Sequence, residues 1–477
     1  MAEGKKIISG LKWTSIQYAV DTIFKFSIRL ILAKLLAPDQ FGLIAMCSIF
    51  LAVADAASEL GMSSALIQKK ENKDAEDLYP TAFTTGVLWG LLLYIIMSLV
   101  IGPLISKFYD EPQLTYLIPA LSIGILIKPF VMIETVALTR EMNFKRIGNI
   151  LNLSSFLAGV LSIVAAFFGA GVWALILNSI LFPLISLPLF LNGSSWKIKF
   201  EFNKQHFKEI FGFGAYSTTT LIFSTITYNI DNLLIGKFLG KSVLGSYTLA
   251  FSLTEQLRQM ISNVLNKVMY PVFGQNQDDK EKLRNYFLTI VNINAIVIYP
   301  IMAFLIIFSN EIIIQFFGEQ WKEAVIPLQI LALAMMVHLL VNSFTSLIRG
   351  LGKPNLEMKI ILGLTLFVLL PSLYYGIVNY GVVGATIAVL FNKIGLVIIG
   401  VIVLKKEISL KINALLNAVK YSILSIMISG AITIFIKSII TNILMILLSA
   451  VLFFGIYAVL IFAFEKQKIM KIIKYIK

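Results

Sequence analysis

Residues 443–464 read ILMILLSAVLFFGIYAVLIFAF, an apolar run without a single charged side chain. A helix needs about 20 mostly apolar residues to cross the hydrocarbon core of a bilayer. Similar runs follow one another along almost the whole chain, in which 58% of the residues are hydrophobic and 14% are charged, with a mean hydropathy of +0.86. An ordinary soluble domain is only about 45–50% apolar. The sequence therefore predicts a protein that lies in a membrane.

The apolar runs have the length of helices. Inside a bilayer only helices and closed barrels can pair all of their backbone polar groups. We predict an all-α integral membrane protein with about 14 spanning helices. They are placed at residues 11–35, 41–67, 80–106, 114–139, 148–168, 172–191, 210–236, 243–270, 284–308, 324–348, 356–378, 381–404, 412–436 and 440–464.

Lysine and arginine gather in alternate loops between these runs. About 27 of them lie in one set of loops or at the two termini and about 5 in the opposite set, a bias typical of the cytoplasmic side. Both termini are therefore predicted to be cytoplasmic. The bias also explains the net charge of +14. Nucleic-acid binding is not needed to explain this charge, since no soluble domain remains that could bind a nucleic acid. The basic stretch from Lys466 to Lys477 is interpreted as an anchor to anionic membrane lipid.

The chain offers little for metal or redox chemistry. Cys47 is the only cysteine, which excludes an internal disulfide and any cysteine cluster for zinc or iron–sulfur. The two histidines, His206 and His338, are far apart in sequence and are assigned to a loop and to a packed helix. We therefore expect no metal site and no cofactor.

An internal repeat divides the chain. Residues 33–37, AKLLA, are followed by Gly42, and residues 236–240, GKFLG, are followed by Gly245, at an offset of about 203 residues. Two further pairs occur in the same order, residues 138–140 with 347–349 and residues 171–174 with 381–384. Three pairs in register indicate that a unit of six helices is duplicated.

Six spans are an even number, so both repeats cross the membrane in the same direction. Transporters with parallel repeats bind the substrate between two halves that are related by an axis along the membrane normal. The predicted domains are a first lobe at residues 1–195, a second lobe at 196–404, and helices 13 and 14 with the basic tail at 405–477.

Ionisable side chains inside the spans are the first candidates for function, because they are costly in lipid and usually face a cavity. The cations that would suit the phosphate oxygens of a substrate are Lys25, Arg29, Lys128, Arg258 and Lys393. The acids that would suit a coupling proton or sodium ion are Asp21, Asp55, Glu59 and Glu255. A structural role stays open for each of them. Glu255 and Arg258, for example, are three residues apart on one helix and could neutralise each other.

Several motifs resemble one known family. The likeness rests on residues 35–46, LLAPDQFGLIAM, and on residues 60–68, LGMSSALIQ. Shorter matches lie at residues 140–144, 169–174, 229–236 and 317–321. Together they resemble the polysaccharide transporter family of the multidrug/oligosaccharidyl-lipid/polysaccharide (MOP) exporter superfamily, and within it the flippases for lipopolysaccharide, colanic acid and O-antigen.

The resemblance implies two six-helix lobes that work by alternating access. It implies a flippase of the bacterial cytoplasmic membrane that moves an undecaprenyl-diphosphate-linked oligosaccharide, the repeat unit of an O-antigen, capsule or exopolysaccharide. Polysaccharide polymerase or export machinery is the protein partner that this role suggests. In the related lipid II flippase cations line the central cavity, and Arg29 and Arg258 are their expected counterparts here.

Three alternatives remain open. A drug/cation antiporter of the same superfamily would share the topology, but a cationic cargo favours an acidic cavity over lysines and arginines. A peptidoglycan-precursor flippase would share the mechanism. A membrane polysaccharide polymerase or ligase would be an enzyme and would need acids, histidines or arginines gathered in the outer loops, which are short here. We predict a transporter and not an enzyme, driven by an ion gradient, the membrane potential or product removal, since no nucleotide-binding loop occurs.

Overall fold

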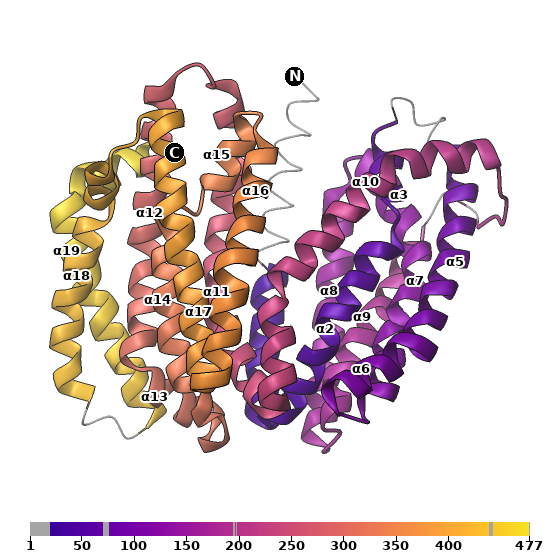
Figure 1. Ribbon diagram of the computed structural model, residues 1–477, viewed down its shortest axis with the longest axis horizontal. Coiled ribbons are helices and arrows are strands. Elements are labelled where there is room, and N and C mark those ends of the chain that lie inside the picture. Colours follow the sequence, from indigo (N-terminus) through magenta and orange to yellow (C-terminus); the bar gives the residue numbers. More distant parts are fainter. Residues whose placement is uncertain (1–19, 70–75, 194–195, 197, 438–441, 477) are drawn as a thin grey trace. The chain divides into compact units, whose positions relative to one another are not determined.

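Every regular element is a helix in the computed structural model, which describes residues 20–69, 76–193, 196, 198–437 and 442–476 (Figure 1). This confirms the predicted all-α class. Ten of the described segments are long and apolar enough to cross a membrane. The chain is thus a multi-pass membrane protein, and the number of about 14 spans stays a prediction.

Interruptions of helices at glycine explain part of the difference between the ten candidate spans and the predicted number of about 14. The segment Pro354–Ile408 is a single candidate span but covers two predicted ones. Its helix is interrupted at Gly381, where φ is 57°, a conformation that glycine adopts without strain. A Cβ on Gly384 would lie 2.0 Å from the carbonyl oxygen of Gly376, so the two halves of the segment touch backbone to backbone. In addition, part of the span predicted at 11–35 lies outside the described residues.

The chain divides into two compact units, Met1–Gly245 and Ser246–Lys477. After a helix at 20–35, the first unit contains α2 (Pro38–Ser58), α3 (Met62–Ile67), α5 (Tyr79–Ile96), the π-helix η1 (Met97–Ile101), α6 (Gly102–Tyr109), α7 (Leu114–Arg140), α8 (Phe144–Phe167), α9 (Val172–Leu191), α10 (Lys204–Tyr228) and the start of α11 (Ile230–Gln275). In it α7 packs against α5 and α9, and α9 packs against α8. The helix predicted to open the second lobe, α10, packs against α2 and α3. The lobe boundaries themselves stay predictions.

The second unit is built around α12. It contains the rest of α11, then α12 (Lys280–Ile307), α13 (Ser309–Ile312), η2 (Ile313–Phe317), η3 (Glu319–Ala324), α14 (Val325–Leu339), α15 (Phe344–Gly350), α16 (Pro354–Leu364), η4 (Thr365–Leu369), α17 (Leu370–Ile408), α18 (Ile412–Lys437) and α19 (Ile443–Ile476). The central helix α12 packs against α14 and α18, and α18 packs against α19 (Figure 1). Of the ten candidate spans α12 is the most buried.

Polar side chains and prolines set where several helices begin. Asn143, Asn203 and Asp279 accept hydrogen bonds from backbone N–H groups in the first turn of α8, α10 and α12. These bonds satisfy donors that have no partner inside the helix. Pro38 and Pro354 stand in the first turn of α2 and α16, where a missing N–H group costs nothing.

Both units expose large apolar side chains. Leu99 and Phe167 of the first unit are 73% and 77% exposed, and Phe367 and Phe435 of the second are 81% and 82% exposed. Soluble proteins rarely expose large apolar patches without a partner. In a bilayer, lipid chains cover such surfaces.

Candidate functional site

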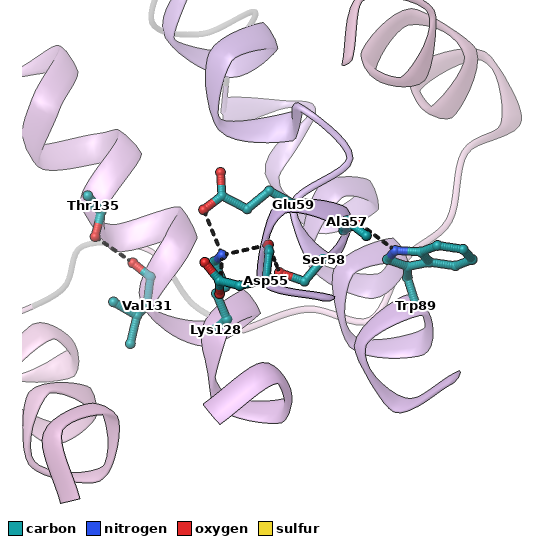
Figure 2. A network of polar contacts seen from close by, with 8 residues as sticks. All are labelled: Asp55, Ala57, Ser58, Glu59, Trp89, Lys128, Val131 and Thr135. Carbon is teal, nitrogen blue, oxygen red and sulfur yellow. Dashed lines mark hydrogen bonds and ion pairs between the residues drawn. The ribbon is translucent and has the colours of Figure 1, made fainter. Parts of the chain in front are cut away.

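A charged centre in the first unit joins α2 to α7 (Figure 2). Lys128 Nζ lies 2.7 Å from Oδ1 of Asp55 and 3.1 Å from Oε1 of Glu59, and it also donates to the backbone carbonyl of Asp55. The two acids are four residues apart at the end of α2, so their carboxylates share one helix face. Trp89 of α5 stabilises the same turn, because its Nε1–H donates to the carbonyl of Ala57 at 2.9 Å. We call Asp55, Glu59 and Lys128 the first centre.

The first centre holds two carboxylates for one ammonium and therefore carries an excess of negative charge. It is partly open to the surroundings, with 24% of the Lys128 side chain and 64% of the Asp55 side chain exposed. The structure thus brings a predicted substrate cation together with two predicted ion-coupling acids. A phosphate group would have to displace both carboxylates to reach Lys128, so this centre is a poor anion site in the state observed.

A second charged centre lies on α11 in the second unit. Arg258 forms a bidentate ion pair with Glu255, with Nε 2.9 Å from Oε2 and Nη2 2.5 Å from Oε1. Gln259 donates to the same carboxylate at 2.8 Å. On its other side, Nη1 of Arg258 donates to Oδ1 of Asn342, which follows α14. Glu255 and Arg258 therefore do form the neutralising pair that their spacing predicts.

Two further helices contribute to this second centre. Lys393 of α17 is close enough to act electrostatically on Glu255 and on His338 of α14, and Arg258 acts on His338 as well. Only 11% of the Arg258 side chain and 14% of the Glu255 side chain are exposed. The second centre, defined as Glu255, Arg258, His338, Asn342 and Lys393, combines two cations with one carboxylate and carries an excess of positive charge.

The helix at 20–35 carries the remaining candidates. Lys25 Nζ lies 2.9 Å from Oδ2 of Asp21 and 5.6 Å from the ring centre of Phe182 on α9. More than half of the Lys25 side chain is exposed. Arg29, one turn further, is half-buried, and within the part of the chain that the structure describes it contacts no carboxylate. Arg29 is thus the predicted cation with the least compensation in the structure.

Residues 31–326 match the model of a family described as polysaccharide biosynthesis proteins. This chain belongs to that family. Among its relatives are the teichuronic acid biosynthesis protein TuaB of Bacillus subtilis, 28% identical over 76% of each chain, and the lipopolysaccharide biosynthesis protein WzxC of Escherichia coli, 26% identical over 83% of this chain and 80% of WzxC. The succinoglycan biosynthesis transport protein ExoT of Rhizobium meliloti is 23% identical over 73% of this chain and 70% of ExoT. The family predicted from the motifs is confirmed.

Solved structures show which fold this polysaccharide biosynthesis protein has. The lipid II flippase MurJ in an inward closed conformation matches with a TM-score of 0.75 and 16% identity, over 96% of this chain and 99% of that chain. A multidrug resistance MATE family transporter of the MOP superfamily, in an inward-facing conformation, matches with a TM-score of 0.65 and 16% identity, over 82% and 94%. The predicted MOP fold is therefore confirmed.

In this polysaccharide biosynthesis protein the predicted repeat relates one residue of the first centre to one residue of the second. At an offset of about 203 residues, Asp55 on α2 corresponds to Arg258 on α11. Helix α2 thus supplies a carboxylate where α11 supplies a guanidinium group. The excess charges of the two centres are opposite in sign.

His338 and Asn342 are not proposed as site residues in the sequence analysis, although their spacing contained a signal for it. His338 and Asn342 are four residues apart, so a continuous helix would place both on the face that meets Arg258. A metal site has no comparable basis, because the described residues contain no group of three or more His, Cys, Asp or Glu side chains that could hold an ion.

Proposed function

We propose that this chain is a flippase that moves an undecaprenyl-diphosphate-linked oligosaccharide across the bacterial cytoplasmic membrane by alternating access. The observation that carries the proposal is the second centre, where Arg258 and Lys393 leave an excess of positive charge within an apolar helical unit. Charges in such surroundings are costly and typically serve a substrate or ion. A diphosphate is a suitable partner, because guanidinium and ammonium groups bind phosphate oxygens strongly.

The names of the relatives support a lipid-linked sugar as cargo. TuaB and WzxC are named for teichuronic acid and lipopolysaccharide biosynthesis, and ExoT is named as a succinoglycan transport protein. Agl15 of Haloferax volcanii, 22% identical, is named as a probable glycan biosynthesis flippase. MurJ is named as a flippase for lipid II. A carrier that recognises a diphosphate and tolerates different sugars would fit all of these roles.

The remaining charged residues receive roles that follow from their partners. Arg29 would make a second contact with the cargo, since it contacts no carboxylate among the residues that the structure describes. Lys25 and Lys128 are held by acids and would reach the cargo only after these acids are neutralised. Protonation or sodium binding at Asp21, Asp55, Glu59 or Glu255 would release the paired cation, which is how ion coupling would work here.

The orientation follows from the distribution of basic residues. We place both termini in the cytoplasm and the basic tail from Lys466 to Lys477 against anionic lipid, because cytoplasmic loops are enriched in lysine and arginine. Polysaccharide polymerase or export machinery would receive the cargo at the outer face. The chain itself would transport without chemical conversion and without a bound cofactor.

A drug/cation antiporter is the second candidate, and the first centre favours it. Its excess negative charge on Asp55 and Glu59 would attract a cation. A peptidoglycan-precursor flippase differs in the group that is attached to the same lipid diphosphate. The three candidate functions differ in the molecule that is transported, so the assay has to compare these molecules.

The test is transport by the purified protein in proteoliposomes. Fluorescent undecaprenyl-diphosphate oligosaccharide, lipid II and a cationic dye would be supplied in parallel, and the translocated fraction measured after quenching of the outer leaflet. Arg258→Ala should slow oligosaccharide flipping at least tenfold, which corresponds to about 1.4 kcal/mol. Lys353→Ala, which removes a peripheral pair with Glu407, is the control and should change the rate less than twofold. Transport of the dye without the oligosaccharide would overturn the proposal.

A further inference from the structure

His338 lies in the last turn of α14, close to the two cations of the second centre. Lys393 of α17 and Arg258 of α11 both act on it electrostatically. Its ring is partly exposed, but the nitrogen Nδ1 is buried and makes no hydrogen bond to any residue that the structure describes. Buried polar atoms in proteins are normally hydrogen-bonded, so Nδ1 would gain from a further contact.

Asn342 carries a second buried nitrogen of this kind. Its Oδ1 accepts a hydrogen bond from Nη1 of Arg258, whereas its Nδ2 donates to no group within the described part of the chain. Amide nitrogens, guanidinium groups and ammonium groups can only donate. Three side chains of the second centre, Arg258, Asn342 and Lys393, therefore carry hydrogen-bond donors. Phosphate oxygens are strong acceptors for such groups.

The surroundings of His338 act on a proton there in opposite directions. The C-terminal end of a helix attracts positive charge, and His338 is the next-to-last residue of α14. Arg258 and Lys393 repel positive charge. From α12, Tyr299 reaches α14 with a neutral hydroxyl, which donates to the carbonyl of Met336 at 2.9 Å.

The acids on the elements that precede α14 lie toward its beginning. They are Glu311, Glu319 and Glu323 of α13 and η3. Element α13 contacts the first half of α14, where Gln329 donates to Ser309. At 1.5 Å per residue, the last turn of α14 lies about 20 Å from its first. Glu255, the carboxylate of the second centre, is already held by Arg258. An anion that balances a proton on His338 would therefore be a ligand and not a side chain of this centre.

We propose that His338 takes up one proton when the diphosphate of the cargo binds to the second centre. The inference rests on the proposed function. A diphosphate that is esterified at both ends keeps one ionised oxygen on each phosphorus and so brings two negative charges. Glu255, Arg258 and Lys393 together carry one positive charge. The proton, taken from water on the side from which the cargo enters, forms the N–H bond at Nδ1 and supplies the second positive charge, so the occupied centre is neutral.

The linkage works in both directions. Bound cargo stabilises the proton, and the proton stabilises bound cargo by the same factor. A protonated Nδ1 also donates a charge-assisted hydrogen bond, which is about twice as strong as a neutral one. The cargo thus crosses the apolar interior in a neutral centre, and a proton accompanies it.

Cargo affinity at different pH values tests the linkage. Fluorescent undecaprenyl-diphosphate oligosaccharide would be titrated onto the purified protein in nanodiscs from about pH 6 to about pH 8, the range in which histidine titrates. The esterified diphosphate has no group that titrates in this range, so a pH dependence comes from the protein. One linked proton changes an affinity by at most about tenfold per pH unit, and we expect binding at the acidic end to be at least about fivefold tighter.

His338→Gln keeps a neutral side chain and should bind the cargo with the same affinity across this range. His206→Gln is the matched control, because His206 stands in the first turn of α10 in the other unit, and it should behave like the wild type. A flat profile in the wild type, or a pH dependence that survives in His338→Gln, would overturn the inference and leave the proposed function intact. Failure to bind the cargo at every pH would overturn both.

A second measurement observes the proton in the wild type and does not depend on how the variant folds. The chain contains two histidines, His206 and His338. Protein with isotope-labelled imidazole nitrogens therefore gives two sets of ring signals in magnetic resonance, and His206→Gln assigns them. On saturation with cargo at neutral pH, the His338 signals should change from those of a neutral ring to those of an imidazolium, while the His206 signals stay the same. A His338 ring that remains neutral with the cargo bound would overturn the inference.

Discussion

Replacing Glu255 by glutamine tests how far this carboxylate neutralises the positive charge of the second centre. The substitution preserves the shape of the side chain and leaves an oxygen that can accept the hydrogen bond from Gln259. It removes the negative charge gripped by Arg258, while Lys393 remains nearby. We expect Glu255→Gln to be less stable than the wild type without ligand and to bind a diphosphate more tightly.

Burial sets the size of the effect. Arg258 and Glu255 are only 11% and 14% exposed, and removing one partner of a buried ion pair costs about 3–5 kcal/mol. Because the amide still accepts hydrogen bonds, we expect the low end, about 3 kcal/mol. A unit of this size loses about 2–4 °C of melting temperature per kcal/mol, so the ligand-free variant should melt about 6–12 °C lower. Without the competing carboxylate, diphosphate affinity should rise about tenfold, or 1.4 kcal/mol.

Thermal unfolding in detergent, with and without undecaprenyl diphosphate, measures both effects. Glu357→Gln is the matched control, because Glu357 is also buried and forked by an arginine, with Nε of Arg349 2.6 Å from its Oε2 and Nη2 3.0 Å from its Oε1. It should lose stability without gaining ligand affinity. The reasoning is refuted if Glu255→Gln binds the diphosphate no more tightly than the wild type, or if both variants gain affinity equally.

Three further predictions concern other parts of the chain. Lys128→Met leaves the two acids of the first centre to repel each other and should lower the melting temperature by a few degrees, and neutralising both acids in the same protein should restore it. Gly42→Ala would place a Cβ 1.7 Å from the carbonyl oxygen of Lys241 and should cost about 1–3 kcal/mol through overpacking, seen as a lower melting temperature, whereas Gly455→Ala, with nothing within 4 Å, should change it little. The hydrogen bond from a backbone N–H group of α12 lowers the pKa of Asp279, so this cap is complete above the ordinary carboxyl pKa and is lost as the pH falls through the lowered pKa. Hydrogen-exchange protection in the first turn of α12 should therefore fall on acidification in the wild type but not in Asp279→Asn.

Hydropathy locates most spans because a bilayer imposes a length and an apolar surface on each of them. The spans predicted at 114–139 and 172–191 match α7 (Leu114–Arg140) and α9 (Val172–Leu191) within a residue. Breaks inside an apolar run are harder to predict. The run predicted at 41–67 is divided into α2 and α3 by Leu60 and Gly61, both at positive φ. A non-glycine residue takes this conformation because its surroundings require it, and hydropathy does not contain that information.

Local charge pairs were predictable, but contacts between helices were not. The helical period places Asp21 beside Lys25 and Glu255 beside Arg258, and both pairs form. The bond from Lys128 to Asp55 joins residues 73 positions apart. It depends on how α2 and α7 are rotated against each other, and this rotation is decided by packing around the whole unit. The charge excess of each centre therefore became visible only with the structure.

The predicted duplication would account for two centres of opposite charge in one chain. A Cβ on Gly42 would lie 1.7 Å from the carbonyl oxygen of Lys241, and a Cβ on Gly245 would lie 1.9 Å from that of Pro38. Asp55 and Arg258 each follow their glycine by the same number of residues. At 1.5 Å per residue both stand about 20 Å along their helices from these glycines. Under the predicted repeat the two positions are equivalent, and only the sign of the charge differs. A pair of identical repeats would offer a diphosphate two equal sites or none. In the function we propose, the change of sign would assign the diphosphate to the second repeat and leave the first for a cation.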